Sequence, residues 1–308
     1  MQNSLTAIIE ELKRLKATGV KSISVSDEAL SRLRKAHGAI RDRRAKAMAS
    51  SEAGNPPARP ATVASPARLE PSPAPLKEEG GVAAIPTPVP FTLPEGDKLT
   101  RMAALRERVL NDEVCKKNIR VGKQIVVGVG NLDAKIMFVG EAPGAEEELQ
   151  GEPFVGPAGQ LLTKMISGMG LTRGDVYIGN IMNWRPQIEA GATGIQYGNR
   201  PPTGEEMQYC LPYLRAQIEI VNPDLLVALG TTAAHGLLGP GSFKALGDVR
   251  GQWSEFGGKP LMVTYHPSYI LRNQSNRSKR MIWEDLLKIM ERAGLSISAK
   301  QRAYYLDK

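Results

Sequence analysis

The sequence predicts an α/β fold: a three-layer α/β/α sandwich around a central, mainly parallel, four-stranded sheet. Three observations predict it. Short apolar runs recur along the chain, which is typical of strands buried on both faces. Amphipathic stretches separate these runs, as in successive βαβ units. Glycine or a small polar residue follows most of the runs, where a strand of a parallel sheet would turn toward its next helix.

Composition and charge exclude several classes of protein. The chain has 308 residues, enough for one or two domains, and a net charge of +8. Its two cysteines, Cys115 and Cys210, cannot form a disulfide framework, which indicates a reducing compartment. No apolar run approaches the ~18 residues of a membrane span, and the N-terminus does not resemble a signal peptide. We therefore expect a cytoplasmic protein that contacts no membrane, and we also expect it to be a monomer.

Residues 1–49 are predicted to be a basic, helical N-terminal segment. They carry 11 Lys or Arg against 5 Asp or Glu. Apolar spacings of three and four predict a helix over 4–17, and a second helix, rich in Arg and Lys, is expected over 28–47. Two short helices bury little surface, so three interpretations stay open: a solvated helical hairpin, a docking module for a protein partner, and a basic arm for DNA.

Residues 50–97 are predicted to form a disordered linker. This stretch holds 11 of the 22 prolines, with alanine, serine and glutamate between them. Such a composition buries too little apolar surface to offset the entropy that the chain loses on folding.

The folded domain is expected over 98–296, followed by a C-terminal tail over 297–308. It opens with a helix over 99–111. Apolar runs then predict strands at 124–128, 136–139, 176–180, 224–230 and 259–265. Helices are expected to begin near residues 158, 202 and 231, and the last one covers 278–293.

Three of these strands end in loops with polar side chains. The strand over 136–139 leads into a Gly- and Pro-containing turn that carries Glu141, and Phe154 follows in a second piece of this kind. Asn180 and His266 follow two other strands. Ligands bind at the carboxyl ends of such strands, so these side chains can converge on one crevice if their strands are neighbours.

These residues and further motifs resemble the uracil-DNA glycosylase superfamily, most closely its family 4. The similarity covers roughly residues 100–293 and depends on the order and spacing of the motifs. They are Gly140–Gly144, Gly151–Gly156, Tyr177–Asn180, Arg185-Pro186, Val227–Gly230, Val249–Trp253, His266–Tyr269, Leu271–Asn273 and Trp283–Leu286.

The resemblance implies a pocket for a uracil base that is flipped out of DNA. Phe154 would stack on the base. Asn180 would read its Watson–Crick edge, because one amide both accepts from N3–H and donates to O4, whereas cytosine presents the reverse pattern. His266 would donate to O2 as negative charge develops on the leaving base. Ala142 would line the substrate pocket.

The resemblance leaves the water-activating group open. Ala142 stands where the best-known family of these glycosylases has an aspartate, so activation falls to Glu141, to Glu148 or to backbone groups. Glu141 would be a catalytic carboxylate, acting either on the water or on the positive charge of an oxocarbenium-like transition state.

The segment after His266 resembles the DNA-reading loop of the family. The resemblance implies DNA contacts by Ser268, Ile270, Leu271 and Arg272. Ile270 or Leu271 would fill the gap left by the flipped nucleotide, the alternative being that both belong to the core. Arg272 would approach phosphate.

The chain departs from family 4 at the cofactor. Family 4 members carry four cysteines that hold an iron–sulfur cluster, and only Cys115 and Cys210 stand at equivalent positions here. Asp112 and Asn118 stand three residues from Cys115, where a paired cysteine would be, and Trp184 occupies a third ligand position. Two thiols cannot build a four-thiolate site, so we expect no metal and no cofactor.

An insert over 187–198 is a second departure. A related subfamily carries an insert of similar length, with a histidine that becomes covalently attached to the sugar. Asn199 falls near that position here, and the insert contains no histidine. The resemblance therefore does not extend to covalent trapping.

The motifs predict a monofunctional uracil-DNA glycosylase, a hydrolase that cuts the N-glycosidic bond of uracil in DNA and initiates base excision repair. The alternative is a weakly active or inactive member that binds DNA or a damaged base. An enzyme for a free nucleotide is disfavoured, because no P-loop or G-x-G-x-x-G fingerprint follows any predicted strand.

Overall fold

The computed structural model describes residues 85–188, 196 and 198–306. These residues belong to one of the two units into which the chain divides, Glu78–Lys308. The helices predicted over 4–17 and 28–47, the linker as far as residue 84 and most of the insert over 187–198 lie outside the described residues.

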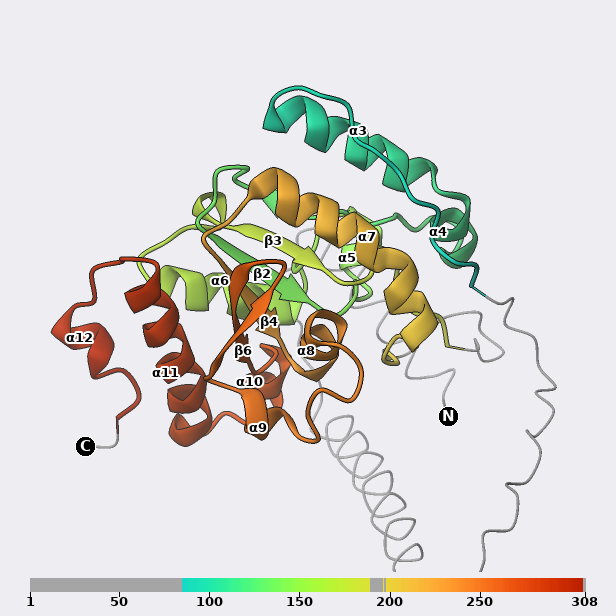
Figure 1. The fold of residues 1–308 in the computed structure, drawn as a ribbon. Coiled ribbons are helices and arrows are strands. Elements are labelled where there is room, and N and C mark those ends of the chain that lie inside the picture. Colours follow the sequence, from blue (N-terminus) through green and yellow to red (C-terminus); the bar gives the residue numbers. More distant parts are fainter. Residues whose placement is uncertain (1–84, 189–195, 197, 307–308) are drawn as a thin grey trace, which may run out of the picture. The chain divides into compact units, whose positions relative to one another are not determined.

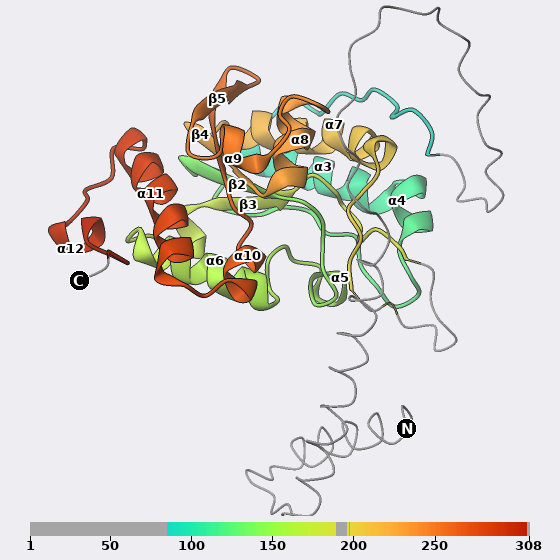
Figure 2. The same cartoon turned by 90° about the horizontal axis from the view of Figure 1, so that it is seen from below.

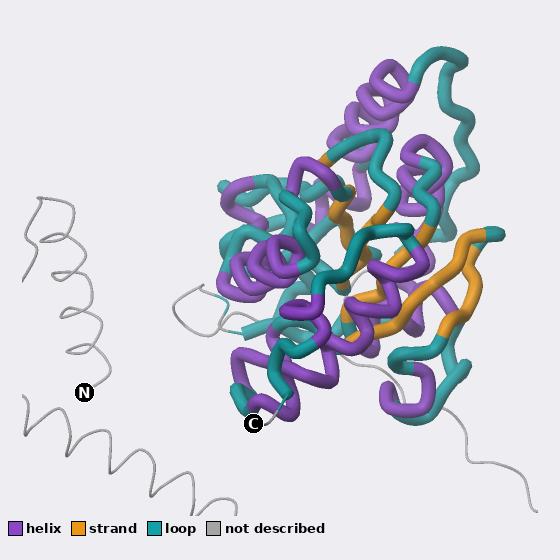
Figure 3. The backbone as a smooth tube through the Cα atoms, turned by 90° about the vertical axis from the view of Figure 1, so that its left-hand side faces the viewer, coloured by secondary structure: helices purple, strands orange, loops and turns teal. Residues whose placement is uncertain are grey.

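A six-stranded sheet runs through the described part of the chain (Figures 1 and 3). Its spatial order is β1-β3-β2-β4-β6-β5. The four central strands are parallel, and β1 and β5 pair antiparallel with the two edges. The strands are β1 (Val129–Gly130), β2 (Ile136–Gly140), β3 (Tyr177–Asn180), β4 (Leu225–Leu229), β5 (Trp253–Phe256) and β6 (Lys259–Thr264).

The predicted α/β class is confirmed, and the four-stranded sheet corresponds to the parallel centre of this mixed one. The predicted number of strands was too low, because the two edge strands do not show as apolar runs. β1 has only two residues, and β5 is largely half-buried or exposed. Short, partly solvated edge strands carry little of the hydrophobic pattern that a sequence reveals.

One predicted strand is wrong. Residues 124–128 form no strand in the structure; instead Gln124 N donates to Glu148 O at 2.7 Å, and Val126 N donates to Asn183 O at 2.8 Å. Ile125 and Val127 are buried beneath helices rather than within the sheet. The apolar run therefore shows that these residues are buried, but an apolar run alone does not show that buried residues form a strand.

Helices cover both faces of the sheet (Figure 2). Successive residues of β2, Phe138 and Val139, point into opposite clusters of apolar side chains, as the pleat of a strand requires. The predicted three layers are therefore present. One face packs against α6 (Pro157–Gly168), α10 (Ser268–Arg272) and α11 (Asn276–Arg292), and the other against α7 (Gly204–Val221) and α8 (Thr231–Leu238).

Two further helices, α3 (Lys98–Asn111) and α4 (Glu113–Asn118), lie outside α7 (Figure 1). Asp112 connects α3 and α4 to α7. Its carboxylate caps α4 by accepting from Cys115 N at 2.7 Å, and it accepts from the hydroxyls of Tyr209 and Tyr213 on α7 at 2.7 and 2.8 Å. Burial raises the pKa of Asp112, but these hydrogen bonds outweigh it and hold the pKa below its ordinary value.

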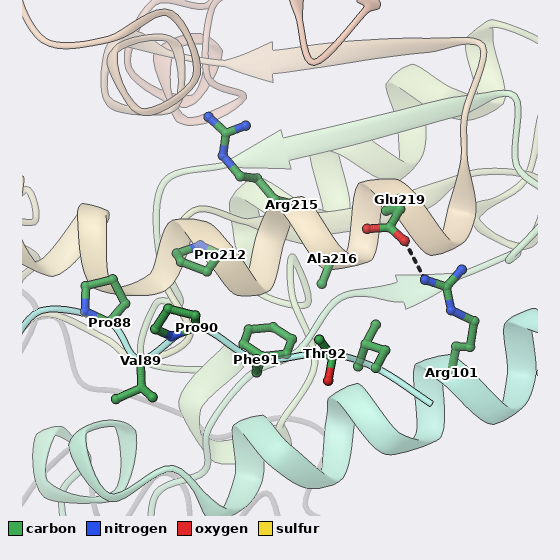
Figure 4. Close-up of a pocket in the computed structure, with 11 residues that line it drawn as sticks. Pro88, Val89, Pro90, Phe91, Thr92, Arg101, Pro212, Arg215, Ala216 and Glu219 are labelled. Carbon is green, nitrogen blue, oxygen red and sulfur yellow. Dashed lines mark hydrogen bonds and ion pairs between the residues drawn. The ribbon is translucent and has the colours of Figure 1, made fainter. Parts of the chain in front are cut away.

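The end of the predicted linker packs on this outer layer. Residues 85–93 have no regular secondary structure, and the side chains of Phe91 and Leu93 contact the apolar cluster between α3 and α7. A cleft of about 600 Å³ opens between this segment and α7, with the ion pair of Arg101 and Glu219 among the residues that line it (Figure 4). The packed chain therefore begins N-terminal to residue 98.

The C-terminal residues also pack on the domain. Trp283 Nε1 donates to Gln301 O at 2.6 Å, and Arg280 Nη1 donates to Arg302 O and Tyr304 O at 2.7 and 2.9 Å. The segment predicted as a tail is thus held on α11. The remaining short elements are α5 (Glu147–Gln150), η1 (Arg173–Asp175), α9 (Leu246–Val249) and α12 (Ala299–Arg302). None of the helices described has the length and apolar character needed to cross a lipid bilayer.

Replacing Asp112 with alanine should lower the free energy of unfolding by about 2 kcal/mol, because α4 loses its cap and two tyrosine hydroxyls lose their acceptor. Urea unfolding of the full chain measures this. The matched control is Asp133→Ala, whose carboxylate is 79% exposed and pairs with Lys98 at 2.7 Å. Its effect should stay within about 0.5 kcal/mol. Equal losses in the two variants would contradict a special role for Asp112.

Candidate active site

The carboxyl ends of the parallel strands meet at one edge of the sheet. Gly140 of β2 lies opposite Asn180 of β3, and the pairing continues into the loops, where Met182 N donates to Glu141 O at 3.1 Å. Beyond β4, Gly230 N donates to Thr264 O of β6 at 2.8 Å. After β2, α6 packs on one face of the sheet, and after β4, α8 packs on the other. This reversal opens a crevice between the two strands.

A cleft of about 730 Å³ occupies this edge. Some of the residues predicted for the site line this cleft and others do not. Those that line it are Glu141, Ala142, Phe154, Asn180, His266, Ser268 and Arg272. Ile270 and Leu271 do not line it: Ile270 is buried in the core between the sheet, α6 and α11, whereas the Leu271 side chain is 43% exposed.

Phe154 and Asn180 share the space above Gly140. A Cβ added to Gly140 would lie 2.4 Å from both Phe154 Cζ and Asn180 Oδ1, so only glycine leaves room for the two side chains. Asn180 Oδ1 is buried and has no hydrogen-bond partner among the described residues. Leaving a buried acceptor unpaired costs about 1–3 kcal/mol. An N–H group of a ligand in the cleft would recover this energy.

His266 presents a neutral imidazole with its proton on Nε2. Ser268 N donates to His266 Nδ1 at 3.2 Å, and the Ser268 hydroxyl lies 2.9 Å from the same nitrogen. Because a backbone N–H can only donate, Nδ1 is the acceptor and Nε2 carries the proton. Ser268, predicted to contact DNA, is thus the residue that orients His266. The ring centroids of His266 and Phe154 are 5.6 Å apart.

The environment of His266 keeps it uncharged. Burial, together with the positive charge of Arg272, lowers the pKa of His266 to about 4, although the negative charge of Glu147 acts in the opposite direction. At neutral pH the imidazole is therefore a hydrogen-bond donor without a net charge. Such a donor can stabilise an oxyanion with no prior protonation step.

Glu141 lines the cleft, as do Glu146 and Glu147. Burial raises the pKa of Glu141 above its usual 4.5, and a hydrogen bond with Thr232 partly offsets this. Thr232 belongs to the first turn of α8 and also lines the cleft. A carboxylate that is partly desolvated is a stronger base than one in water.

Glu148, the other carboxylate considered for water activation, lies elsewhere. It is 6% exposed, accepts from Arg185 Nη1 at 2.9 Å and pairs with Lys123 at 3.5 Å, and it does not line the cleft. Arg185 also donates through Nε to Asn199 Oδ1 at 2.8 Å. The Glu148–Arg185 pair therefore anchors the end of the insert, and the expectation that Glu148 acts on water does not agree with its position.

Glu147 is a site residue that the sequence did not reveal. Its carboxylate accepts from Gly144 N at 3.1 Å, Val155 N at 3.0 Å and Gly156 N at 2.9 Å. It thereby ties together the two halves of the loop that carries Glu141 and Phe154. The available signal was an acidic residue three positions after the Gly144 turn, but its partners lie eight and nine residues further on.

The positions of the family 4 cysteines hold a packed core. Cys115, Cys210 and Trp184 are fully buried in the cluster between α3, α4 and α7. A hydrogen bond with Cys210, together with burial, raises the pKa of Cys115 far above its ordinary value. The described residues contain no group of three or more His, Cys, Asp or Glu able to hold a metal ion. Two thiols and an indole do not fit a four-thiolate iron–sulfur cluster.

Comparisons with known proteins agree with this geometry. The family model for the uracil DNA glycosylase superfamily matches residues 127–287, which include every residue that lines the cleft. The chain belongs to this superfamily. It is 44% identical over 188 residues to the type-4 uracil-DNA glycosylase of Thermotoga maritima, covering 61% of this chain and 92% of that protein.

Members of two types of the superfamily from Pyrobaculum aerophilum are also similar. The type-4 uracil-DNA glycosylase of that organism is 39% identical over 183 residues, 57% of this chain and 87% of the relative. Its type-5 uracil-DNA glycosylase is 30% identical over 173 residues, 53% of this chain and 73% of the relative. The resemblance to a family 4-like uracil-DNA glycosylase is thereby confirmed.

We expect His266 to stay neutral as the pH falls through 6.5, its ordinary pKa, and to take up a proton only near pH 4. The direction follows because a lowered pKa extends the neutral form to lower pH. NMR titration of protein with isotope-labelled histidine checks this: the chain has three histidines, and His266→Gln assigns the signal.

The control for this titration removes one cause of the shift. Arg272→Gln deletes a nearby positive charge and should move the titration of His266 upward, because protonation then meets less repulsion. A His266 signal that titrates near 6.5 in the unmodified chain would contradict the proposed neutral donor.

Proposed function

We propose that this protein is a monofunctional DNA glycosylase that hydrolyses the N-glycosidic bond of uracil in DNA and leaves an abasic site. The observation that carries the proposal is the buried, unpaired amide oxygen of Asn180 beside the ring of Phe154. The printed names of its relatives, type-4 uracil-DNA glycosylases at 37–44% identity, support it.

Asn180 supplies the base specificity in this proposal. Its Oδ1 accepts from uracil N3–H, and its Nδ2 donates to O4. Cytosine offers an acceptor at N3 and a donor at the adjacent exocyclic group, so each contact would become a mismatch that costs about 1–3 kcal/mol. The ring of Phe154 stacks on the base and excludes water from one of its faces.

His266 stabilises the leaving base. As the bond between base and sugar lengthens, negative charge collects on the uracil, and O2 receives a hydrogen bond from His266 Nε2–H. The donor is fixed in advance by Ser268 and needs no reorganisation when the charge develops. Burial makes this interaction stronger than it would be in water.

Glu141 acts on the sugar side of the bond. In its ionised form it faces the positive charge of an oxocarbenium-like sugar and orients or deprotonates the attacking water. Ala142 contributes no polar group, so Glu141 is the acidic side chain we assign to this role. Because the pKa of Glu141 is raised, this contribution falls as the pH drops through that raised pKa.

Two residues of α10, Leu271 and Arg272, contact the DNA in this proposal. Leu271, 43% exposed, is the wedge that fills the space of the flipped nucleotide, while the buried Ile270 supports it from the core. Flipping costs a few kcal/mol, which the wedge and the pocket offset. Arg272, in the last turn of α10 and at the cleft, approaches the phosphate backbone.

An oligonucleotide with one uracil tests the activity. Treatment with the protein should produce strand scission only after alkali, because a monofunctional enzyme leaves the abasic backbone intact. Asn180→Ala and His266→Gln should each lower kcat/KM by about 100-fold, as expected for the loss of a preorganised hydrogen bond to the base. Steady-state kinetics on the full chain measure these changes.

The matched control for this assay is Asn222→Gly. Asn222 caps the end of α7 with φ 52°, a backbone conformation that glycine also adopts. Its exposed Oδ1 accepts from Lys259 Nζ at 2.6 Å. It should leave kcat/KM within about twofold. Tight binding of the uracil oligonucleotide without scission would contradict the proposed glycosylase activity and favour the alternative, a superfamily member that only binds DNA.

We also propose that the enzyme works without an iron–sulfur cluster. Protein purified without oxygen should then be colourless and contain less than about 0.1 iron atom per chain, with no absorption band near ~400 nm. Metal analysis and an absorption spectrum check this. A brown protein with about four iron atoms per chain would contradict the proposal.

A further inference from the structure

We propose that Arg173 is a positioning residue that holds the base-stacking ring of Phe154 in place, an inference that rests on the function proposed above. Arg173 lies in η1, directly before β3, and does not line the cleft. Any effect of Arg173 on a substrate in the cleft is therefore indirect.

Phe154 has a backbone conformation that aromatic residues seldom adopt. Its φ is 56°, in the left-handed region, where the Cβ of an L-residue is crowded by the backbone. Such a conformation persists only where the surrounding structure imposes it, and such residues cluster at ligand sites.

Arg173 donates hydrogen bonds to the carbonyl oxygens on both sides of the Phe154 Cα. Its Nη1 donates to Phe154 O at 3.0 Å, and its Nη2 donates to Pro153 O at 2.9 Å. The first carbonyl moves with ψ of Phe154 and the second with φ. Two nitrogens of one planar guanidinium thus restrain both angles together, which the single ammonium of a lysine cannot do with the same geometry.

The first turn of α6 packs against the same residue, and Arg173 Nη1 also lies 3.4 Å from Thr163 Oγ1 of this helix. A Cβ added to Gly159 would lie 1.9 Å from Phe154 O, so the helix backbone presses directly on this residue. Together, α6 and Arg173 restrain the Phe154 backbone, and the ring is directed over Gly140 beside Asn180. Arg173 thereby sets the distance between the ring that stacks on the base and the amide that reads it.

A double-mutant cycle tests the inference. Arg173→Met should lower kcat/KM on a uracil oligonucleotide about tenfold in the unmodified chain, because the ring leaves its stacking position. In the Phe154→Ala background the same change should alter kcat/KM by less than about twofold, since the ring through which Arg173 acts is gone. A tenfold loss in both backgrounds would overturn the inference, because Arg173 would then act on something other than Phe154.

The matched control is Arg280→Met. Arg280 also grips two carbonyls, Arg302 O at 2.7 Å and Tyr304 O at 2.9 Å, but on the C-terminal segment packed against α11. It should leave kcat/KM within about twofold. Arg173→Lys keeps the charge and one donor and should retain intermediate activity. This variant replaces Arg173→Met in the cycle if the latter does not fold.

A spectroscopic readout separates this inference from the proposed function. The chain has five phenylalanines, so protein with isotope-labelled phenylalanine gives few amide signals. The coupling between the amide and α protons of Phe154 reports φ directly. Arg173→Met should change it and Arg280→Met should not. An unchanged Phe154 signal in Arg173→Met overturns the inference, whereas a changed signal in a chain that never excises uracil supports it and contradicts the proposed function.

Discussion

The parallel pairing of β2 with β3 is the constraint on which the site depends. Because Gly140 is opposite Asn180, the turn that carries Glu141 begins beside the amide, and the pairing extends into both loops. A shift by one residue would turn the Asn180 side chain to the other face of the sheet. The buried residues of both strands prevent such a shift, so the core that stabilises the domain also fixes the geometry of recognition.

Around this pair, two charged side chains bind the backbone of the loop that carries Glu141 and Phe154. Glu147 uses its carboxylate on three backbone N–H groups, and Arg173 uses its guanidinium on two carbonyls. Neither group needs to touch a substrate to matter. The loop at the cleft is thus held by hydrogen bonds from its neighbours, whereas Asn180 Oδ1 has no partner among the described residues.

The parallel core and the meeting of Glu141, Asn180 and His266 were predictable, because both follow from apolar runs and from the rule that parallel strands end at one edge. The edge strands were not, since a two-residue strand leaves no pattern. The roles of Glu147 and Arg173 depend on partners that only the folded loop brings near. The exclusion of Glu148 from the cleft likewise depends on a tertiary ion pair.

The junction of α4 with α7 has a consequence for the conditions in which the protein keeps its shape. Asp112, two tyrosine hydroxyls and a buried indole close it. Under our proposal that the chain holds no iron–sulfur cluster, this junction depends on hydrogen bonds and packing alone, and iron depletion, a chelator or peroxide should leave it intact. The outer layer of α3 and α4 would then stay attached to α7 under conditions that destroy iron–sulfur clusters.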